Sequence, residues 1–341
     1  MTDHEATGPG TIPTTMRAVA QDRYGDPATV LAAVELPVPV PQPDRVLVRV
    51  EAMSINAYDW HMVAASPAFV RLVGFGFARP KYPIPGRDFA GTVVAAGADV
   101  SDLAVGDRVF GSHPGTAAEY VAAKPANLAT IPDGVSFASA ASVPMAGTTA
   151  LQAVRDHGRV EAGSKVLVLG ASGGVGQFVV QMAKAAGAVV TGVCGTHNLE
   201  VVRDLGADRV VDYSQEDVYG LDERFDVVVH VNGTYPLKRL RRIMADDGVL
   251  VLVGSDEGGA LLGPARFMFG QVLAARFAPQ TAVQFTAVNA REDLVTLAGM
   301  LADDSLSVAI DHRAPLGDIG AEISELRRGH ARGKVVIDVG T

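Results

Sequence analysis

The chain has 341 residues, of which 48% are hydrophobic and 6% are aromatic. At roughly 100–200 residues per domain, this length predicts two domains whose cores rely on Val, Ala and Leu. The formal net charge of -9 and the pI of about 5.4 argue against a nucleic-acid partner. The basic run at residues 238–242 is interpreted as a solvated helix face.

Cysteine content and hydropathy bear on the cellular setting. Cys194 is the single cysteine, so neither an intrachain disulfide nor a cysteine-rich zinc site is expected. Residues 1–15 are acidic, rich in Gly, Thr and Pro, and without a signal-peptide pattern, which predicts a loose tail. The chain lacks a run of about 18 apolar residues, so no membrane span is predicted. We therefore expect a cytoplasmic protein with no membrane partner.

The first half of the chain has the pattern of a β domain. Short strands are predicted at Met16–Ala20, Val46–Val50, Phe89–Ala96, Gly106–Gly111 and Ala117–Ala122. The prolines of the segment LPVPVPQPD exclude both a helix and a central strand between the first two. Many short strands separated by Gly and Pro turns are typical of a small barrel-like domain.

From about residue 138 the pattern changes to helices and then to alternating strands and helices. This alternation predicts a parallel, doubly wound sheet. Its predicted strands are Val166–Leu169, Val189–Cys194, Arg209–Asp212, Phe225–Val231, Val249–Val253 and Val283–Val288, with helices at Gly174–Ala186, Leu199–Leu205 and Leu237–Met244.

The end of the chain is expected to leave this sheet. A helix from Asp293, a strand at Leu306–Ile310 and a helix near Ile319–Arg328 precede a closing strand, Lys334–Val339, which we predict to pair with the first domain. The predicted division is a tail at 1–15, a catalytic domain at 16–137 with 304–341, and a nucleotide-binding domain at 138–303.

The turn from residue 170 to residue 176 reads Gly-Ala-Ser-Gly-Gly-Val-Gly between a buried strand and a helix. Gly173 lets the backbone approach a pyrophosphate, Gly176 lets helix and strand pack closely, and the helix N-terminus offers free N–H groups. Ala171 occupies the first glycine position of G-x-G-x-x-G, so the match is imperfect. A tight turn without a ligand is the alternative, and the strand–helix–strand context favours dinucleotide binding.

The end of the second strand of this unit bears on the choice of dinucleotide. An NAD-preferring site usually carries an acidic residue there, whereas this chain has Cys194, Gly195, Thr196, His197 and Asn198. A 2′-phosphate would meet no acidic residue in this run and is predicted to accept hydrogen bonds from the Gly195 N–H, Thr196 and Asn198. His197 is expected to add a hydrogen bond or partial positive charge, and Lys184 on the preceding helix is a candidate cation. We therefore predict NADP(H), with Cys194 as a small apolar strand-end residue.

Eight segments in chain order resemble a known family: SINAYDWH, PIPGRDFAGTVVAAG, VGDRVFG, AAEYV, PMAGTTALQAV, VLVLGASGGVGQFVVQMAKAAGA, LGADRVVDY and HARGKVVIDV. Together they are similar to the zinc-independent quinone oxidoreductase branch of the medium-chain dehydrogenase/reductase superfamily. The resemblance implies a GroES-like β-barrel catalytic domain, a Rossmann domain and an active site in the cleft between them. It also implies hydride transfer from NADPH to a small hydrophobic quinone, an α,β-unsaturated ketone or a related carbonyl, in a homodimer formed by edge-to-edge sheet pairing. Gln284–Val288 is the candidate edge.

The resemblance also assigns the cofactor-binding residues. Asn232 is added because it directly follows the fourth strand of the sheet. The residues assigned by the resemblance are Thr149, Ala171, Ser172, Gly173, Gly174, Val175, Gly176, Lys184, Tyr213, Val253, Gly254, Arg332 and Lys334.

No metal is expected. The zinc-dependent relatives need a Cys in the SINAYDWH segment and His-Glu in the GRDFAG segment, where this chain has Arg87 and Asp88. An alternative is a metal site formed by Asp59, His61 and Asp88. We favour the interpretation that these residues form hydrogen bonds to the backbone and to Arg87.

Without a metal, charge developing on the substrate oxygen must be met by hydrogen-bond donors. Asn56 matches the family's active-site asparagine and is the candidate carbonyl donor, with a turn asparagine as the alternative. Tyr58 or His61 is the candidate proton donor, although solvent or a purely structural His61 are alternatives. The apolar segment Phe69–Pro83 is a candidate substrate wall. The rival functions are an NAD(P)-linked alcohol dehydrogenase and a catalytically weak NADPH-binding sensor or structural protein.

Overall fold

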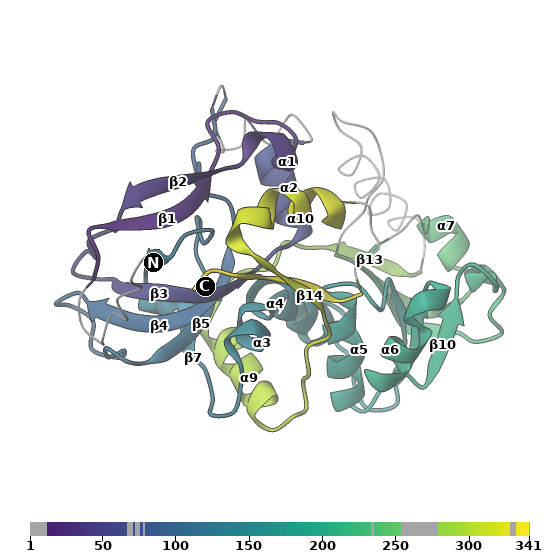
Figure 1. Cartoon of the computed structure of the whole chain (residues 1–341). Helices are drawn as coiled ribbons and strands as arrows, with labels where there is room; N and C mark the ends of the chain where they lie inside the picture. Colours follow the sequence, from purple (N-terminus) through teal and green to yellow (C-terminus); the bar gives the residue numbers. More distant parts are fainter. Residues whose placement is uncertain are drawn as a thin grey trace.

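The computed structural model describes residues 12–66, 71, 76–77, 79–232, 235–253, 279–327 and 332–340. Two sheet-based units lie side by side, and chain segments from the end of the sequence cross back between them (Figure 1). Gly254 and most of the predicted tail lie outside the described residues. Among the described helices, none has the length and apolar character to cross a membrane.

The amino-terminal unit is a seven-stranded sheet built around β3 (Val46–Ser54). β3 pairs antiparallel with β4 (Asp88–Ala96), β6 (Tyr120–Ala123) and β15 (Lys334–Asp338). The other strands of this sheet are β5 (Arg108–Ser112), β7 (Leu128–Thr130) and β14 (Ile310–Pro315). The closing strand therefore joins the first unit, as predicted.

A two-stranded ribbon and short helices complete this unit. β1 (Thr15–Ala20) pairs with β2 (Ala32–Pro37) and meets the main sheet at an Ala18–Ala118 bridge. The helices are α1 (Pro27–Val30), α2 (Ala57–Ala64), α10 (Ile319–Leu326) and the 3-10 turns η2 (Pro125–Asn127) and η6 (Leu316–Asp318). The proline-rich segment after β2 contains no strand beyond Pro37, as its prolines require.

The second unit is an all-parallel sheet of six strands in the order β10-β9-β8-β11-β12-β13. The direction of strand order reverses between β8 and β11, so this is the predicted doubly wound arrangement. The strands are β8 (Lys165–Leu169), β9 (Val189–Cys194), β10 (Arg209–Asp212), β11 (Phe225–His230), β12 (Met244–Leu252) and β13 (Thr281–Gln284).

Helices cover both faces of this sheet. Those nearest the sheet are α5 (Gly176–Ala185), α6 (Leu199–Asp204) and α7 (Leu237–Leu240), with shorter turns η3 (Ala153–His157), η4 (Thr196–Asn198) and η5 (Val218–Gly220). α4 (Pro144–Gln152) packs on α5 and on α9 (Arg291–Ala302), whereas α3 (Phe137–Ala141) contacts β3 and β4 of the first unit. α7 ends before the predicted Met244 because Met244 pairs with Phe225 and starts β12.

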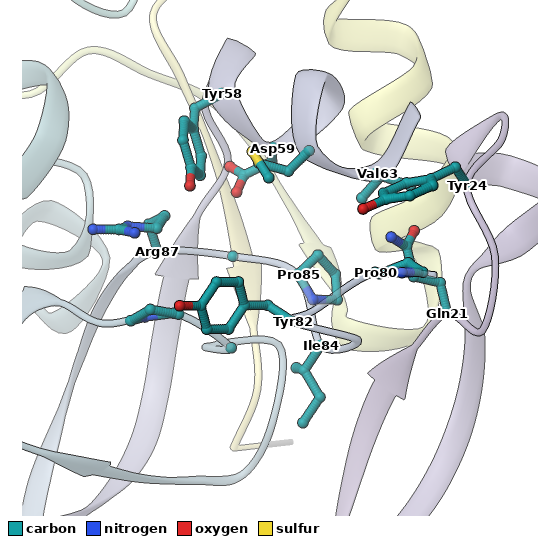
Figure 2. Close-up of a pocket in the computed structure, with 14 residues that line it drawn as sticks. Gln21, Tyr24, Tyr58, Asp59, Val63, Pro80, Tyr82, Ile84, Pro85 and Arg87 are labelled. Carbon is teal, nitrogen blue, oxygen red and sulfur yellow. The ribbon is translucent and has the colours of Figure 1, made fainter. Parts of the chain in front are cut away.

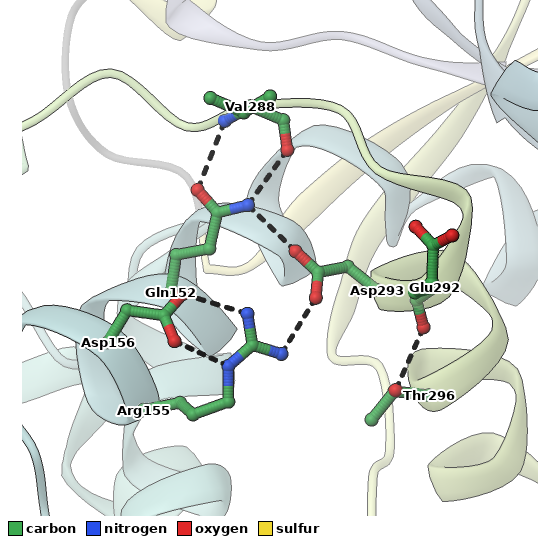
Figure 3. Close-up of polar contacts among 7 residues, drawn as sticks. All are labelled: Gln152, Arg155, Asp156, Val288, Glu292, Asp293 and Thr296. Carbon is green, nitrogen blue, oxygen red and sulfur yellow. Dashed lines mark hydrogen bonds and ion pairs between the residues drawn. The ribbon is translucent and has the colours of Figure 1, made fainter.

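The segment after β13 leaves the sheet earlier than predicted. The side chain of Gln152 binds both the N–H and the carbonyl of Val288, at 3.0 and 2.8 Å (Figure 3). The same amide donates to Asp293, which also accepts from Arg155 at 2.7 Å. This clamp holds the backbone of Val288 against α4 and α9, so the strand stops at Gln284.

The predicted strand Leu306–Ile310 is wrong, because its backbone is paired with side chains instead of a strand. Gln181 on α5 accepts from the N–H and hydroxyl of Ser307 and donates to its carbonyl. Gln177, one helical turn earlier, accepts from the N–H of Ala309 at 2.7 Å. Since two buried glutamines supply the hydrogen bonds that a strand needs, β14 begins only at Ile310.

The same contacts attach the chain that returns to the first unit to α5. Gln181→Ala should lower the free energy of unfolding by about 2–3 kcal/mol, because three hydrogen bonds are lost and the polar groups of Ser307 lose their partner. Urea denaturation measures this. Gln215→Ala, at an exposed glutamine, is the control and should change the value by less than about 0.5 kcal/mol; equal effects of the two variants would contradict this account.

Candidate active site

A cavity of about 450 Å³ opens at the carboxyl ends of the parallel strands. Gly170 follows β8, Gly195 follows β9, Tyr213 follows β10 and Asn232 lies two residues beyond β11, and all four line it. The cavity therefore lies where the strand order reverses, which is where doubly wound sheets bind ligands. Of the predicted cofactor residues, Ser172, Gly173 and Asn198 also line it.

The turn after β8 is made by glycines at two exacting positions. Gly170 has a φ of 85°, a left-handed conformation, so it makes the tight turn rather than Ala171. A Cβ at Gly176 would lie 2.0 Å from the carbonyl oxygen of Gly170. Ala171 is itself fully buried. The motif is thus G-x-x-G-x-x-G, and its last glycine permits the close approach of helix and strand that was predicted.

The space above this turn fits a pyrophosphate. α5 begins at Gly176, later than the predicted Gly174, and its first backbone bond runs from Gln177 to Gly173. The N–H groups of residues 174–176 thus lie at the open end of the helix. A Cβ at Gly173 would meet nothing closer than 3.3 Å. Backbone N–H groups and an unobstructed glycine are the features that hold a diphosphate.

The rim at the end of β9 differs in detail from the prediction. Thr196 donates its hydroxyl to Asp212, at 2.6 Å, so that proton is not directed at a ligand. Asn198 donates to Ser172 at 3.1 Å and ties this rim to the glycine turn. The Tyr213 hydroxyl would lie 3.1 Å from a Cβ at Gly195. His197 is exposed beside them.

Lys184 is not part of this rim, and the prediction for it is wrong. It lies in the last turn of α5, at the opposite end from the glycine turn. Its ammonium pairs with Asp208 at 2.8 Å and donates to the carbonyl of Ala188. The prediction failed because the helix points this lysine toward the amino ends of the strands.

The sequence analysis missed the far wall of the cavity, which includes Tyr219, Tyr235 and Arg239 together with residues 216–218. The guanidinium of Arg239 lies 3.8 Å from the centre of the Tyr219 ring and 4.0 Å from Asp217. Arg239 was interpreted as part of a solvated basic face. The local sequence around Arg239 does not indicate a binding residue. Arg239 reaches the cavity only because of the order of the strands in the sheet.

A buried charge cluster joins the two units beside the glycine turn. Lys334 at the start of β15 is 2% exposed, and its ammonium donates to Asn56 at 2.6 Å and to the Ile55 carbonyl at 3.2 Å. A Cβ at Gly174 would lie 3.4 Å from the Lys334 side chain. Asn56 donates in turn to Asp88, at 3.0 Å. The Asn56 side chain is therefore held by two buried charged groups, while the Asn56 backbone bonds Asp59 within its own turn.

Two carboxyl groups share this cluster. Asp88 also accepts from the N–H of Met145 at the start of α4, and Asp59 accepts from the N–H of Asn56 at 2.7 Å. Burial raises the pKa of Asp88, raises the pKa of Asp59 to about 7 and lowers the pKa of Lys334. With a pKa of about 7, Asp59 is about half protonated at neutral pH, so the cluster does not hold two full carboxylate charges beside the Lys334 ammonium.

A second, smaller pocket lies beside this cluster, with about 30 Å³ of room (Figure 2). Tyr58 on α2 and Arg87 face each other at one side, with the guanidinium 5.4 Å from the ring centre. Burial raises the pKa of Tyr58, and the charge and hydrogen bonding of Arg87 oppose that rise. Pro80 and Tyr82 of the predicted wall line this pocket, while several other residues of Phe69–Pro83 lie outside the described ranges.

The remaining predicted residues are dispersed. His61 bonds the Ser66 carbonyl at 2.6 Å through Nδ1, and its ring packs against Trp60. Thr149 donates to the Met145 carbonyl within α4. Val175, Val253 and Arg332 do not line either pocket. Over the ranges that the structure describes, no three His, Cys, Asp or Glu side chains gather as a metal site.

Comparisons with known proteins agree with this architecture. Residues 42–133 match the model "Alcohol dehydrogenase GroES-like domain", and residues 205–337 match "Zinc-binding dehydrogenase". The chain is 31% identical to the "Chloroplast envelope quinone oxidoreductase homolog" of Arabidopsis thaliana, covering 95% of this chain and 98% of that protein. The chain belongs to the quinone oxidoreductase branch of the medium-chain dehydrogenase/reductase superfamily.

Two further relatives extend this family likeness. The chain is 31% identical to the "NADPH-dependent alkenal/one oxidoreductase, chloroplastic" of Arabidopsis thaliana over 97% of this chain and 81% of that protein. The quinone oxidoreductase structure from Coxiella burnetii superposes with a TM-score of 0.83 at 29% identity, covering 95% of this chain and 99% of that one. In this branch member, Asn56, Arg87 and Asp88 stand on the segments where zinc-dependent relatives place their ligands.

The neutral state of Asp59 has a consequence for stability. Because its pKa is about 7 in the folded protein and about 4 in the unfolded chain, the folded state binds more protons between these values. Stability should therefore fall as pH rises from about 4 to about 7. The Asp59→Asn side chain stays neutral at every pH, so this loss does not occur in the variant. As pH rises from about 4 to about 7, the free energy of unfolding of the variant should increase relative to that of wild type by on the order of 2–4 kcal/mol.

Thermal unfolding at several pH values measures this difference. Asp99→Asn, at an exposed position of the same unit, is the matched control and should run parallel to wild type. A difference between Asp59→Asn and wild type that does not change with pH would show that Asp59 is ionised in the fold.

Proposed function

We propose that the protein is an NADPH-dependent oxidoreductase that reduces quinones, α,β-unsaturated ketones or related carbonyls without zinc. The observation that carries this proposal is the glycine-lined cavity at the strand ends, with the Asn56–Lys334–Asp88 cluster beside its turn. The names of the relatives, quinone oxidoreductase and alkenal/one oxidoreductase, support the substrate class.

The protein's own contribution is to orient the reactants and to meet charge. A bound nicotinamide supplies the hydride. The N–H groups of residues 174–176 bind the diphosphate, and Lys334 lies against Gly174 at that turn. Asn56 uses its carbonyl oxygen for Lys334 and one amide hydrogen for Asp88, which leaves its second amide hydrogen for a substrate carbonyl.

Tyr58 is the better candidate proton donor. Its hydroxyl group lines the small pocket beside the cluster, whereas the Nδ1 of His61 is bound to the Ser66 carbonyl. His61 therefore stabilises the C-terminal turn of α2. We propose that Tyr58 donates the proton to the reduced product and is reprotonated from solvent.

The preference for NADP(H) over NAD(H) belongs to the same proposal. The β9 end carries Cys194, Gly195 and Thr196 where an NAD site usually carries an acid. Asp212 approaches Thr196 from the next strand, but its carboxylate is occupied by the hydroxyls of Thr196 and Ser214. Arg239 supplies a guanidinium to the same cavity, and we assign it to the 2′-phosphate.

The activity is tested with purified protein and a panel of benzoquinone, menadione, methyl vinyl ketone, crotonaldehyde and simple alcohols, following nicotinamide absorbance. We expect NADPH to be oxidised with quinones and enones. Oxidation of alcohols by NADP⁺ in the absence of enone reduction would favour an alcohol dehydrogenase. Tight NADPH binding without turnover of any acceptor would favour a sensor or structural role.

Arg239→Gln tests the cofactor assignment. Loss of a charge-assisted contact should weaken NADPH binding by roughly 10-fold or more, with little change for NADH. Binding is measured by calorimetry. Lys238→Gln, at the adjacent exposed cation outside the cavity, is the control and should leave both affinities unchanged. If Arg239→Gln weakens both cofactors equally, Arg239 contacts a part common to both.

We also propose a cytoplasmic homodimer. Within the described residues β13 is the last strand of the six-stranded sheet, and its outer edge is the candidate for pairing with a second copy, although of the predicted edge Gln284–Val288 only Gln284 lies in the strand. Light scattering should give twice the mass of the chain, and Val283→Pro should shift it toward the monomer because proline disrupts edge pairing. A monomeric wild type would refute the dimer.

The cytoplasmic location is tested by cell fractionation. The buried free thiol of Cys194 is consistent with a reducing compartment.

A further inference from the structure

The small pocket beside α2 contains polar groups that the fold does not use. Its room of about 30 Å³ suffices for a water or for one small polar group, not for a ring. Gln21, Asp59 and Arg87 line it, and each has a buried polar atom without a hydrogen-bond partner in the described part of the chain: Oε1, Oδ1 and Nε. Buried polar atoms normally have partners, so this pocket is built for an occupant.

Arg87 is the group that selects the occupant. It is held at the start of β4, where its carbonyl accepts from His113 at 2.8 Å, and Gly86 before it has a φ of 93° with a Cβ position only 2.4 Å from Thr116. No described carboxylate forms a salt bridge with this guanidinium. Asp59 and Asp88 lie within electrostatic range, but their hydrogen bonds go to Asn56 and Met145.

The charge of the neighbourhood is consequently positive at neutral pH. Lys334 and Arg87 supply two cations, whereas burial raises the pKa of both carboxyl groups, that of Asp59 to about 7, so Asp59 and Asp88 together carry less than two full negative charges. A partly buried cation without its own counter-ion favours an oxygen that carries or gains negative charge.

The pocket is also next to the site where hydride would arrive. Arg87 precedes Asp88 in the chain, and Tyr58 follows Asn56 by two residues, so both flank the Asn56–Asp88 hydrogen bond. Asn56 accepts a hydrogen bond from Lys334, and the Lys334 side chain lies against Gly174 at the dinucleotide turn. Figure 2 shows the Tyr58 hydroxyl directed toward Arg87 at this end of the pocket, with the guanidinium extending to the side, 5.4 Å from the ring centre.

We propose that Arg87 is a catalytic residue that, together with Tyr58 and beside the Asn56 amide, binds the substrate's carbonyl oxygen where this pocket meets the Asn56–Asp88 hydrogen bond, and stabilises its negative charge in place of a metal. This inference rests on the proposed function. Hydride addition at the conjugated carbon moves an electron pair onto the carbonyl oxygen. Arg87 donates hydrogen bonds to that oxygen and stays protonated throughout, while a proton from Tyr58 or solvent completes the product. Only the oxygen end of the substrate enters the pocket.

A binding experiment with para-nitrophenol tests this without turnover. The protein saturated with NADP⁺ is titrated with the probe above and below the probe's pKa, and the absorbance of the phenolate reports its ionisation. We expect the phenolate to bind more tightly than the phenol, so that the pKa of the bound probe falls. Arg87→Met should lower phenolate affinity by roughly 10- to 100-fold and leave phenol affinity nearly unchanged.

Kinetics provide the second readout. Arg87→Met should lower kcat with quinones or enones by roughly 100-fold with only a small change in KM, as expected for a donor that acts in the transition state. Arg87→Lys keeps the charge without the planar fork and should retain part of both effects. Arg49→Met, at a half-exposed arginine of β3 paired with Glu51, is the matched control.

The outcomes separate the two proposals. Equal phenolate affinity in wild type and Arg87→Met would overturn the role of Arg87 and leave a pocket for water only. Absence of turnover in the wild type with every acceptor would overturn the proposed function, while the phenolate shift would still report on Arg87. If Arg87→Met does not fold, Arg87→Lys and Arg87→Gln carry the same comparison.

Discussion

The buried ammonium of Lys334 is the interaction on which the arrangement of the site depends. Taking a lysine out of water costs several kcal/mol unless its charge and donors are satisfied. Here Asn56 and the Ile55 carbonyl accept its hydrogen bonds, and Asp88 supplies nearby negative charge. These partners come from the junction of β3 and α2 and from the start of β4, while Lys334 begins β15. The charge therefore fixes where three distant segments meet, directly against Gly174 of the nucleotide turn.

The two pockets differ in how their lining is supplied. The large one has glycines and strand ends on one side and the side chains of Tyr219, Tyr235 and Arg239 on the other. The small one is lined by α2 and by the loops after β1, before β4 and after β5, with aromatic, proline and charged members. The glycine turn thus offers backbone groups to a ligand, whereas the small pocket offers mainly side chains.

Local sequence was sufficient where the function depends on local geometry. The glycines of the 170–176 turn and the strand ends β9 and β10 follow from spacing alone, and the closing strand was identified because it had no place in the alternating pattern. Patterns failed where partners are distant. Nothing in residues 306–310 reveals that Gln177 and Gln181 will take the place of a strand.

The polar residues show the same limit. Lys184 and Arg239 both lie on helices. Only the direction of each helix decides that Arg239 faces the cavity and that Lys184 pairs with Asp208 away from it. Arg87 was predicted to stand at the place of a zinc ligand and to bond Asp59, His61 or Asp88, but the hydrogen bonds of both carboxylates go to Asn56 and Met145. Its relation to Tyr58 depends on how the loop before β4 passes α2, which spacing along the chain does not encode.

The position of β15 has a consequence for the order in which the two units are completed. This strand lies between β14 and β3, and it is contributed by residues 334–338. The antiparallel sheet is therefore incomplete until these residues have been synthesised. The six strands of the parallel sheet precede β15 in the chain, so that sheet is able to fold first and to serve as a template on which the antiparallel sheet is completed.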